Sequence, residues 1–167
     1  MNRGIPRRWL AVATLVCFVV GCSAPNLPDP AETQKKVNQE KLRKGKLLYA
    51  AFLDEAIRGA DILASQPEAN QLEAEIKKLN ELLAQAADVY PENATLNEAG
   101  KRCRGIVRYF TASLTTIKHN FTGKTDVPVK TKEGVYKACA SNESAARKSV
   151  EIARRDLGLA PSADDEK

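Results

Sequence analysis

The residues best suited to chemistry in this chain are its four cysteines and its single histidine, His119. Cys103 and Cys139 lack the C-x-x-C spacing of a redox pair, and one histidine cannot build the common zinc sites without other ligands at suitable spacing. Cys103 with His119 as its base is conceivable, but the two lie about four turns apart on one expected helix. There is also no Gly-rich phosphate loop. We therefore expect no catalytic residue, no metal, no bound cofactor and no enzymatic activity, with His119 on the surface.

The N-terminal segment has the composition of an export signal. Arg3, Arg7 and Arg8 precede an apolar run from Trp9 to Val20, which is too short for a transmembrane helix of about 20 residues. The run ends in Val19-Val20-Gly21-Cys22-Ser23. An apolar residue, a tolerant position, a small residue and then a cysteine is a pattern that resembles the lipobox of bacterial lipoprotein precursors.

This resemblance implies a fate for the first residues of the chain. Residues 1–21 would be removed by cleavage between Gly21 and Cys22. Cys22 would carry a diacylglycerol thioether and an N-acyl lipid. Ser23, as a residue other than Asp after the cysteine, implies the outer membrane with the domain facing the periplasm. An ordinary secretory signal cut after Ala24 is the alternative, and the sequons at Asn93, Asn120 and Asn142 mildly favour it.

Export also sets the expectation for the remaining cysteines. Cys17 lies in the signal and Cys22 carries the lipid, so Cys103 and Cys139 are left in an oxidising compartment, where we expect a disulfide. The alternative is two buried thiols that pack as small hydrophobes. In a simple antiparallel hairpin the two would miss each other by about 16 Å, so the bridge requires loop 122–131 to double back and the last helix to start near Phe110.

Charge narrows the range of partners. The formal net charge is +5, but loss of the three signal arginines lowers it to +2, which makes nucleic acid a poor partner. Cations still gather at the start of the mature domain and face only Glu40. They are Lys35, Lys36, Lys41, Arg43, Lys44 and Lys46. Beside a lipid anchor they are possible membrane-surface contacts; the alternative is a solvated helix end.

Apolar residues at steps of three and four predict four helices. The first covers 32–64, and Ser65-Gln66-Pro67-Glu68 would be a capping box that starts the second, which ends at Pro91. Asn93 would cap the third helix, whose last residues precede loop 122–131. The fourth runs to Leu157, with Gly158 as its cap. The carboxylates of Glu73, Glu75 and Glu81 are expected on solvated faces.

Together these features predict an all-α protein with a four-helix bundle-like domain. Residues 22–31 form a lipidated, Pro-rich, extended tether, residues 32–158 the domain, and residues 159–167 a flexible tail. We expect a lipid-anchored envelope protein that acts through protein–protein interaction as an adaptor, assembly or exclusion factor. The alternatives are a periplasmic bundle that binds small molecules and, less favoured, an enzyme acting on the cell wall.

Overall fold

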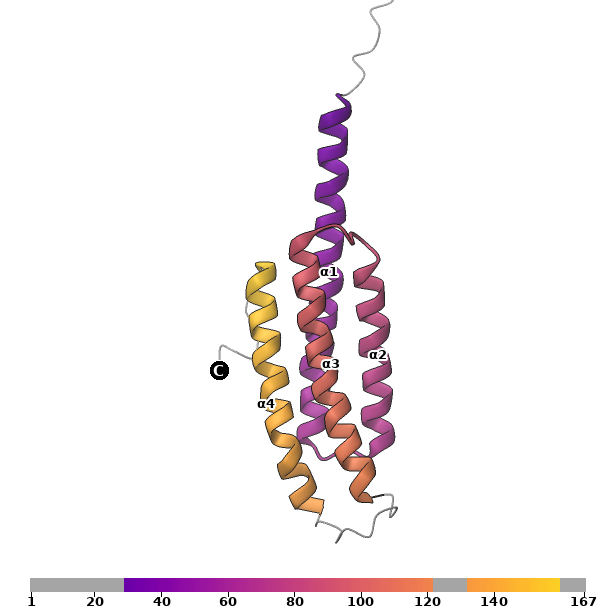
Figure 1. Cartoon of the computed structure of the whole chain (residues 1–167), viewed down its shortest axis with the longest axis vertical. Helices are drawn as coiled ribbons and strands as arrows, with labels where there is room; N and C mark the ends of the chain where they lie inside the picture. Colours follow the sequence, from indigo (N-terminus) through magenta and orange to yellow (C-terminus); the bar gives the residue numbers. More distant parts are fainter. Residues whose placement is uncertain (1–28, 122–131, 160–167) are drawn as a thin grey trace, which may run out of the picture.

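A computed structural model describes residues 29–121 and 132–159, and within these ranges it contains helices and no strand. The helices are α1 (Pro30–Ala64), α2 (Ala69–Ala87), α3 (Ala94–Phe121) and α4 (Lys132–Leu157). They run alternately down and up, side by side, as Figure 1 shows. The predicted all-α, four-helix bundle-like domain is confirmed.

Helices α1 and α3 form the centre of the bundle. Each of them contacts all of the other helices, whereas α2 and α4 share no contact and lie on opposite sides of the bundle (Figure 1). Small buried residues on α1 allow this close approach. At Gly59, a Cβ atom would lie 3.2 Å from Cγ of Glu75 and 3.3 Å from the ring of Phe110. A larger side chain there would push α2 and α3 away from α1.

The core is built from the buried side of each helix, and Phe121, which lies on the expected apolar face of α3, is exposed. Most of the expected face of this helix is buried, namely Val135, Cys139, Ala146, Val150, Ala153 and Leu157. Asn142, on the same face, is half-buried and donates to Oγ of Ser113 at 3.2 Å. Tyr136 is also buried, although its position beside the stripe did not predict this, and its hydroxyl donates to the carbonyl of Pro67.

The connection between α1 and α2 differs from the prediction. Ser65 ends α1 instead of starting α2, because its Oγ donates to the carbonyl of Ile62 at 2.7 Å. Gln66 adopts a positive φ of 58° and turns the chain before Pro67. The capping box lies three residues later, where the Gln71 side chain accepts from the Glu68 amide at 3.0 Å.

The start of α3 and the end of α4 have the caps that the sequence predicted. Asn93 caps α3, since its Oδ1 accepts from the amide of Leu96 at 3.1 Å. Gly158 follows α4 with a φ of 65°. The expectation that α4 starts near Phe110 is wrong. The ring centroids of Phe121 and Tyr136 lie 6.1 Å apart, so α4 begins level with the end of α3. Loop 122–131, which was expected to double back, lies outside the described residues.

The positive φ of Gln66 gives a stability prediction. A non-glycine residue in the left-handed region costs about 1–2 kcal/mol, so Gln66→Gly should raise the free energy of unfolding by up to about 1 kcal/mol after the entropic cost of glycine. The matched control is Gln85→Gly, on the exposed side of α2, which should lower it by about 1 kcal/mol. Urea unfolding measures both, and destabilisation by Gln66→Gly would contradict the turn geometry.

Candidate functional site

The predicted lipidation site, Cys22, and the predicted cleavage site between Gly21 and Cys22 lie outside the described residues. The described chain begins at Asp29, at the free end of α1. A search of the described helices for a segment long and apolar enough to cross a bilayer finds none. The described part of the chain that lies nearest in sequence to the predicted lipidation site is therefore the free end of α1.

The first part of α1 extends beyond the other helices, as Figure 1 shows. We call residues 30–41 the stalk: none of them is buried, and the first buried residue of α1 is Gly45. At 1.5 Å per residue the stalk is about 18 Å long. The side of α1 that faces the core lower down continues upward as Ala31, Gln34 and Asn38, so it is small and polar rather than apolar.

Local contacts hold the stalk helical without a covering helix. The Asp29 side chain accepts from the amide of Ala31 at 2.9 Å, and Gln34 donates to Asn38 at 3.0 Å. Two exposed ion pairs follow, Glu32–Lys36 at 2.8 Å and Glu40–Arg43 at 2.7 Å, and pairs at these spacings favour the helical conformation. Because the helix is already nucleated in the bundle, the stalk only has to propagate it.

The six predicted membrane-contact residues do not share one face. At about 100° per residue, Lys35 and Lys44 lie on opposite sides of α1. Lys36 forms an ion pair with Glu32, and Arg43 forms one with Glu40. Nζ of Lys41 lies 5.6 Å from the ring centroid of Tyr90. The side of the stalk could therefore bring only some of these cations to a flat membrane at once.

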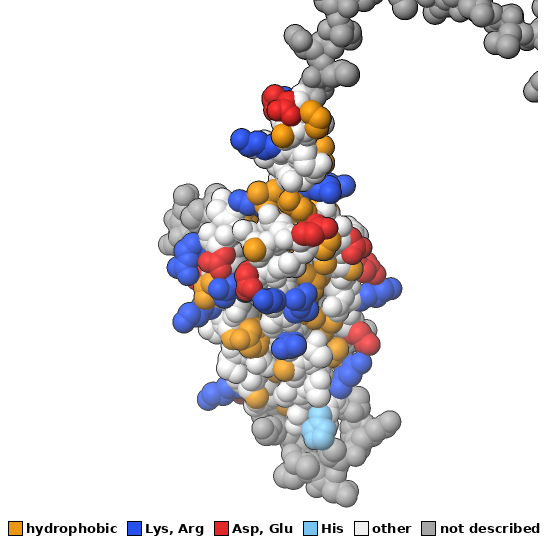
Figure 2. Space-filling view, turned by 45° about the horizontal axis from the view of Figure 1, so that its top comes forward, with side chains coloured by type: hydrophobic (Ala, Val, Ile, Leu, Met, Phe, Trp, Pro, Cys, Tyr) orange, Lys and Arg blue, Asp and Glu red, His pale blue; other side chains and the backbone are white. Residues whose placement is uncertain are grey.

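A groove lies where the stalk meets the α2–α3 loop, and we call it the junction groove. Its lining residues are Ala31, Gln34, Lys35, Asn38, Gln39, Leu42, Tyr90 and Asn93. Leu42 and Tyr90 are half-buried and are its two large apolar side chains. Figure 2 shows apolar side chains gathered at the base of the stalk, with Lys and Arg side chains beside them.

The loop under the groove is held in place by its own hydrogen bonds. The amide of Asn93 donates to the carbonyl of Tyr90 at 3.1 Å. The side chain of Asn97 donates to the carbonyl of Pro91 at 2.7 Å. Tyr90 is thereby fixed against the stalk, and the groove is formed without any ligand.

The predicted disulfide is not formed, because Cys103 and Cys139 are both free and buried. Sγ of Cys139 lies 3.8 Å from the carbonyl oxygen of Ser113. Ser113 is ten residues beyond Cys103 on α3, about 15 Å along the axis, whereas a bridge needs Cα atoms within about 7 Å. The two thiols therefore pack as small hydrophobes, which was the alternative reading of the sequence.

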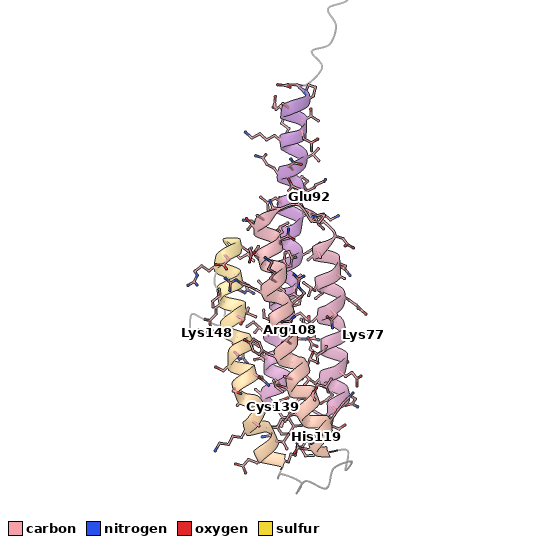
Figure 3. All side chains as sticks on the ribbon, in the orientation of Figure 1. Lys77, Glu92, Arg108, His119, Cys139 and Lys148 are labelled. Atoms are coloured by element: carbon pink, nitrogen blue, oxygen red, sulfur yellow. The ribbon has the colours of Figure 1, made fainter. Side chains whose placement is uncertain are left out.

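Burial also makes the thiols poor nucleophiles. It raises the pKa of Cys103 to about 12 and raises the pKa of Cys139 as well, so little thiolate forms at neutral pH. His119 is exposed near the far end of α3 from Cys103 (Figure 3). The conceivable cysteine–histidine pair is therefore not assembled.

The expectation that Glu75 lies on a solvated face is also wrong, because its side chain is only 4% exposed. Its Oε2 lies 3.1 Å from Nη2 of Arg58, and Oε1 of Glu55 lies 2.7 Å from both Arg58 and Lys78. The sequence carried a signal for this burial: Glu75 is three residues after Leu72 and four before Leu79, and so lies on the apolar stripe of α2.

The pKa values of the two carboxyl groups in this cluster shift in opposite directions. Burial raises the pKa of Glu75, and its hydrogen bond with Glu55 raises it further against the opposing effect of Arg58. Burial acts in the same direction on Glu55, but its contacts with Lys78, Glu75 and Arg58 outweigh it and leave that pKa below its usual value. Glu75 therefore holds its proton more readily than Glu55 does, and the two carboxyl groups, with Arg58 and Lys78, link α2 to α1.

Residues 29–121 and 132–159 contain no group of three or more His, Cys, Asp or Glu side chains that could hold a metal ion. Comparison with known proteins adds no assignment: no family model, no curated protein and no solved structure matches the chain. The junction groove and the stalk are therefore the candidate site on the evidence of their geometry.

Two buried thiols that are far apart predict a simple chemical behaviour. The folded protein, purified without reductant, should react slowly with a thiol reagent at neutral pH. After denaturation, still without reductant, both Cys103 and Cys139 should be labelled, as measured by peptide mass spectrometry. Recovery of a Cys103–Cys139 linked peptide from the unreduced protein would contradict the packing of α4 on α3.

Burial of Glu75 predicts a pH-dependent stability. Because its folded-state pKa is raised, the stability that it contributes is present at low pH and is lost as the pH rises through that value. Glu75→Gln removes this loss, so its free energy of unfolding should rise relative to the unmodified protein as the pH increases above the usual carboxyl range. Glu81→Gln, at an exposed position of α2, is the control and should show no such trend in denaturant melts.

Proposed function

We propose that this protein is a lipid-anchored envelope protein whose helical domain acts by binding another protein, as an adaptor, assembly or exclusion factor. The observation that carries this proposal is the stalk. It places the bundle at the end of a solvated helix whose start follows the lipobox-like Cys22 by only a short stretch of chain.

The dimensions favour a role away from the bilayer surface. Residues between Cys22 and Pro30, if extended at about 3 Å per residue, span about 24 Å. The stalk adds about 18 Å, so the bundle can stand about 40 Å from the lipid. At that distance a protein is a more accessible partner for the bundle than the lipid headgroups are.

The address within the envelope is part of this proposal. Ser23 after the cysteine supports the outer membrane, with the domain facing the periplasm, by resemblance to other lipoprotein precursors. Contact of the stalk cations with an anionic surface stays a prediction. Their spread around the helix suits a helix that meets the membrane end-on better than one lying flat on it.

The alternative of a small-molecule binder is less well supported by the packing. A ligand in the bundle centre needs an apolar cavity. That centre is occupied by large side chains with no exposed surface, including Phe52, Phe110, Leu79 and Ile106. The junction groove, by contrast, is open along the stalk and suits an elongated partner.

Lipid anchoring is tested with one substitution. Cys22→Ala should abolish incorporation of radiolabelled palmitate and leave residues 1–21 attached, which intact mass spectrometry of the full-length protein reports. Cys17→Ala, within the predicted signal, is the matched control and should leave both readouts unchanged. Palmitate labelling that survives Cys22→Ala would refute the lipid-anchored part of the proposal.

A further inference from the structure

We propose that the junction groove binds an acidic, amphipathic helical segment of the partner protein. This inference rests on the proposed protein-binding function and deepens it, because it names the surface and the chemistry of the partner. The recognition would be that of a helix in a groove, with a few apolar anchors and flanking charge pairs.

The shape of the groove suits a helix laid beside the stalk. Helices α2 and α3 meet in the loop below the groove, whereas α1 continues past it, so one side of the stalk has no helical neighbour (Figure 1). A partner helix resting on this loop would extend the bundle layer by about three turns. Leu42 and Tyr90 would receive its apolar residue, since both are half-buried already.

The charge of the groove selects an acidic partner. Lys35 lines the groove and Lys41 stacks on its Tyr90, and neither has a carboxylate partner among the described residues. The nearby acids of α1 are already used, since Glu32 pairs with Lys36 and Glu40 with Arg43. Carboxylates on the partner would therefore find cations that no residue of the described chain neutralises.

The groove also sets the orientation of the partner. Glu92 stands on the loop at the base of the stalk, as Figure 3 shows, so it repels an acidic residue placed there. The partner's carboxylates are therefore expected at the level of Lys35, with its apolar residue nearer the loop over Leu42. The carboxamides of Gln34 and Asn38 line the wall between these points and can bond to uncharged polar side chains.

A flat anionic membrane would use the stalk differently. Lys44 is exposed and carries the same charge as Lys35, but it lies on the opposite side of α1. A membrane recognises charge density and would accept either side, whereas a groove-bound helix contacts only the side of Lys35. These two lysines are therefore a matched pair for testing the proposal.

The experiment uses the full-length protein in a non-ionic detergent and a fluorescent helical peptide. The peptide carries leucines at helical spacing on one side and glutamates beside them, and a second peptide has each Glu replaced by Gln. Fluorescence anisotropy measures binding at low salt. We expect Lys35→Glu to weaken binding of the acidic peptide about tenfold, Lys44→Glu less than about twofold, and the Gln peptide to bind about tenfold more weakly.

A second variant tests the apolar part of the groove. Leu42→Gln keeps a helix-forming side chain of similar length and should weaken the acidic peptide about tenfold without changing its salt dependence. Circular dichroism shows whether each variant keeps its helical content. Equal weakening by Lys35→Glu and Lys44→Glu, or equal binding of the two peptides, would overturn the proposal.

Binding to vesicles that contain about one third anionic lipid distinguishes a groove that binds a protein helix from cations that bind lipid. If both lysine variants reduce vesicle binding while neither changes peptide binding, the cations serve lipid and the groove proposal fails. This outcome is independent of the palmitate test on Cys22, so loss of the anchor and loss of the groove are distinguishable. Groove-dependent peptide binding would stand even if Cys22 carried no lipid.

Discussion

The structure depends on close packing along the inner side of α1. This helix, like α3, contacts each of the other three, and its buried glycines and alanines let its neighbours approach closely. At Gly45, where burial begins, a Cβ atom would lie 2.3 Å from Cδ1 of Leu96, and at Gly59 it would lie 3.2 Å from Cγ of Glu75. Above Leu42 the same side of the helix carries only small and polar residues. The boundary between bundle and stalk is therefore set by a change in residue type within one continuous helix.

The position of α4 follows from packing and ion pairs rather than from a covalent link. Its inner face is built largely from small and β-branched residues, and it is joined to α1 through Arg147–Asp61 at 2.6 Å and Arg154–Asp54, and to α3 through Arg102–Asp156 at 2.7 Å. These contacts fix an antiparallel register in which Cys139 lies level with Ser113. Burial of the apolar face of α4 in this register therefore excludes a disulfide between Cys139 and Cys103. Forming that disulfide would require α4 to slide by about ten residues along α3.

Much of the fold was predictable because apolar periodicity records which side of each helix is buried. The helices, the cap at Asn93 and the turn at Gly158 were all derived from the sequence. The failures arose where local patterns compete with tertiary contacts. The spacing of Ser65 and Glu68 is compatible with one capping box formed by both residues. It is equally compatible with Ser65 ending one helix and Glu68 starting the next. Glu75 lies on the apolar stripe of α2, but its charged partner Arg58 is seventeen residues away on α1. The junction groove was not predictable, since it joins Leu42 to Tyr90 across the bundle.

The polarity of the stalk bears on the kind of partner that a groove of this form can hold. A stalk with an apolar inner side would bind another helix permanently, because burying each large apolar side chain contributes about 1.5–3 kcal/mol. Here the uncovered side offers Leu42 and Tyr90 as apolar anchors, and the rest of the lining is mainly amides and a lysine. Few anchors and a small contact area are typical of reversible complexes. Affinity for the proposed helix would then depend on its carboxylates, so that exchange of partners, rather than stable assembly, is the behaviour that the groove favours.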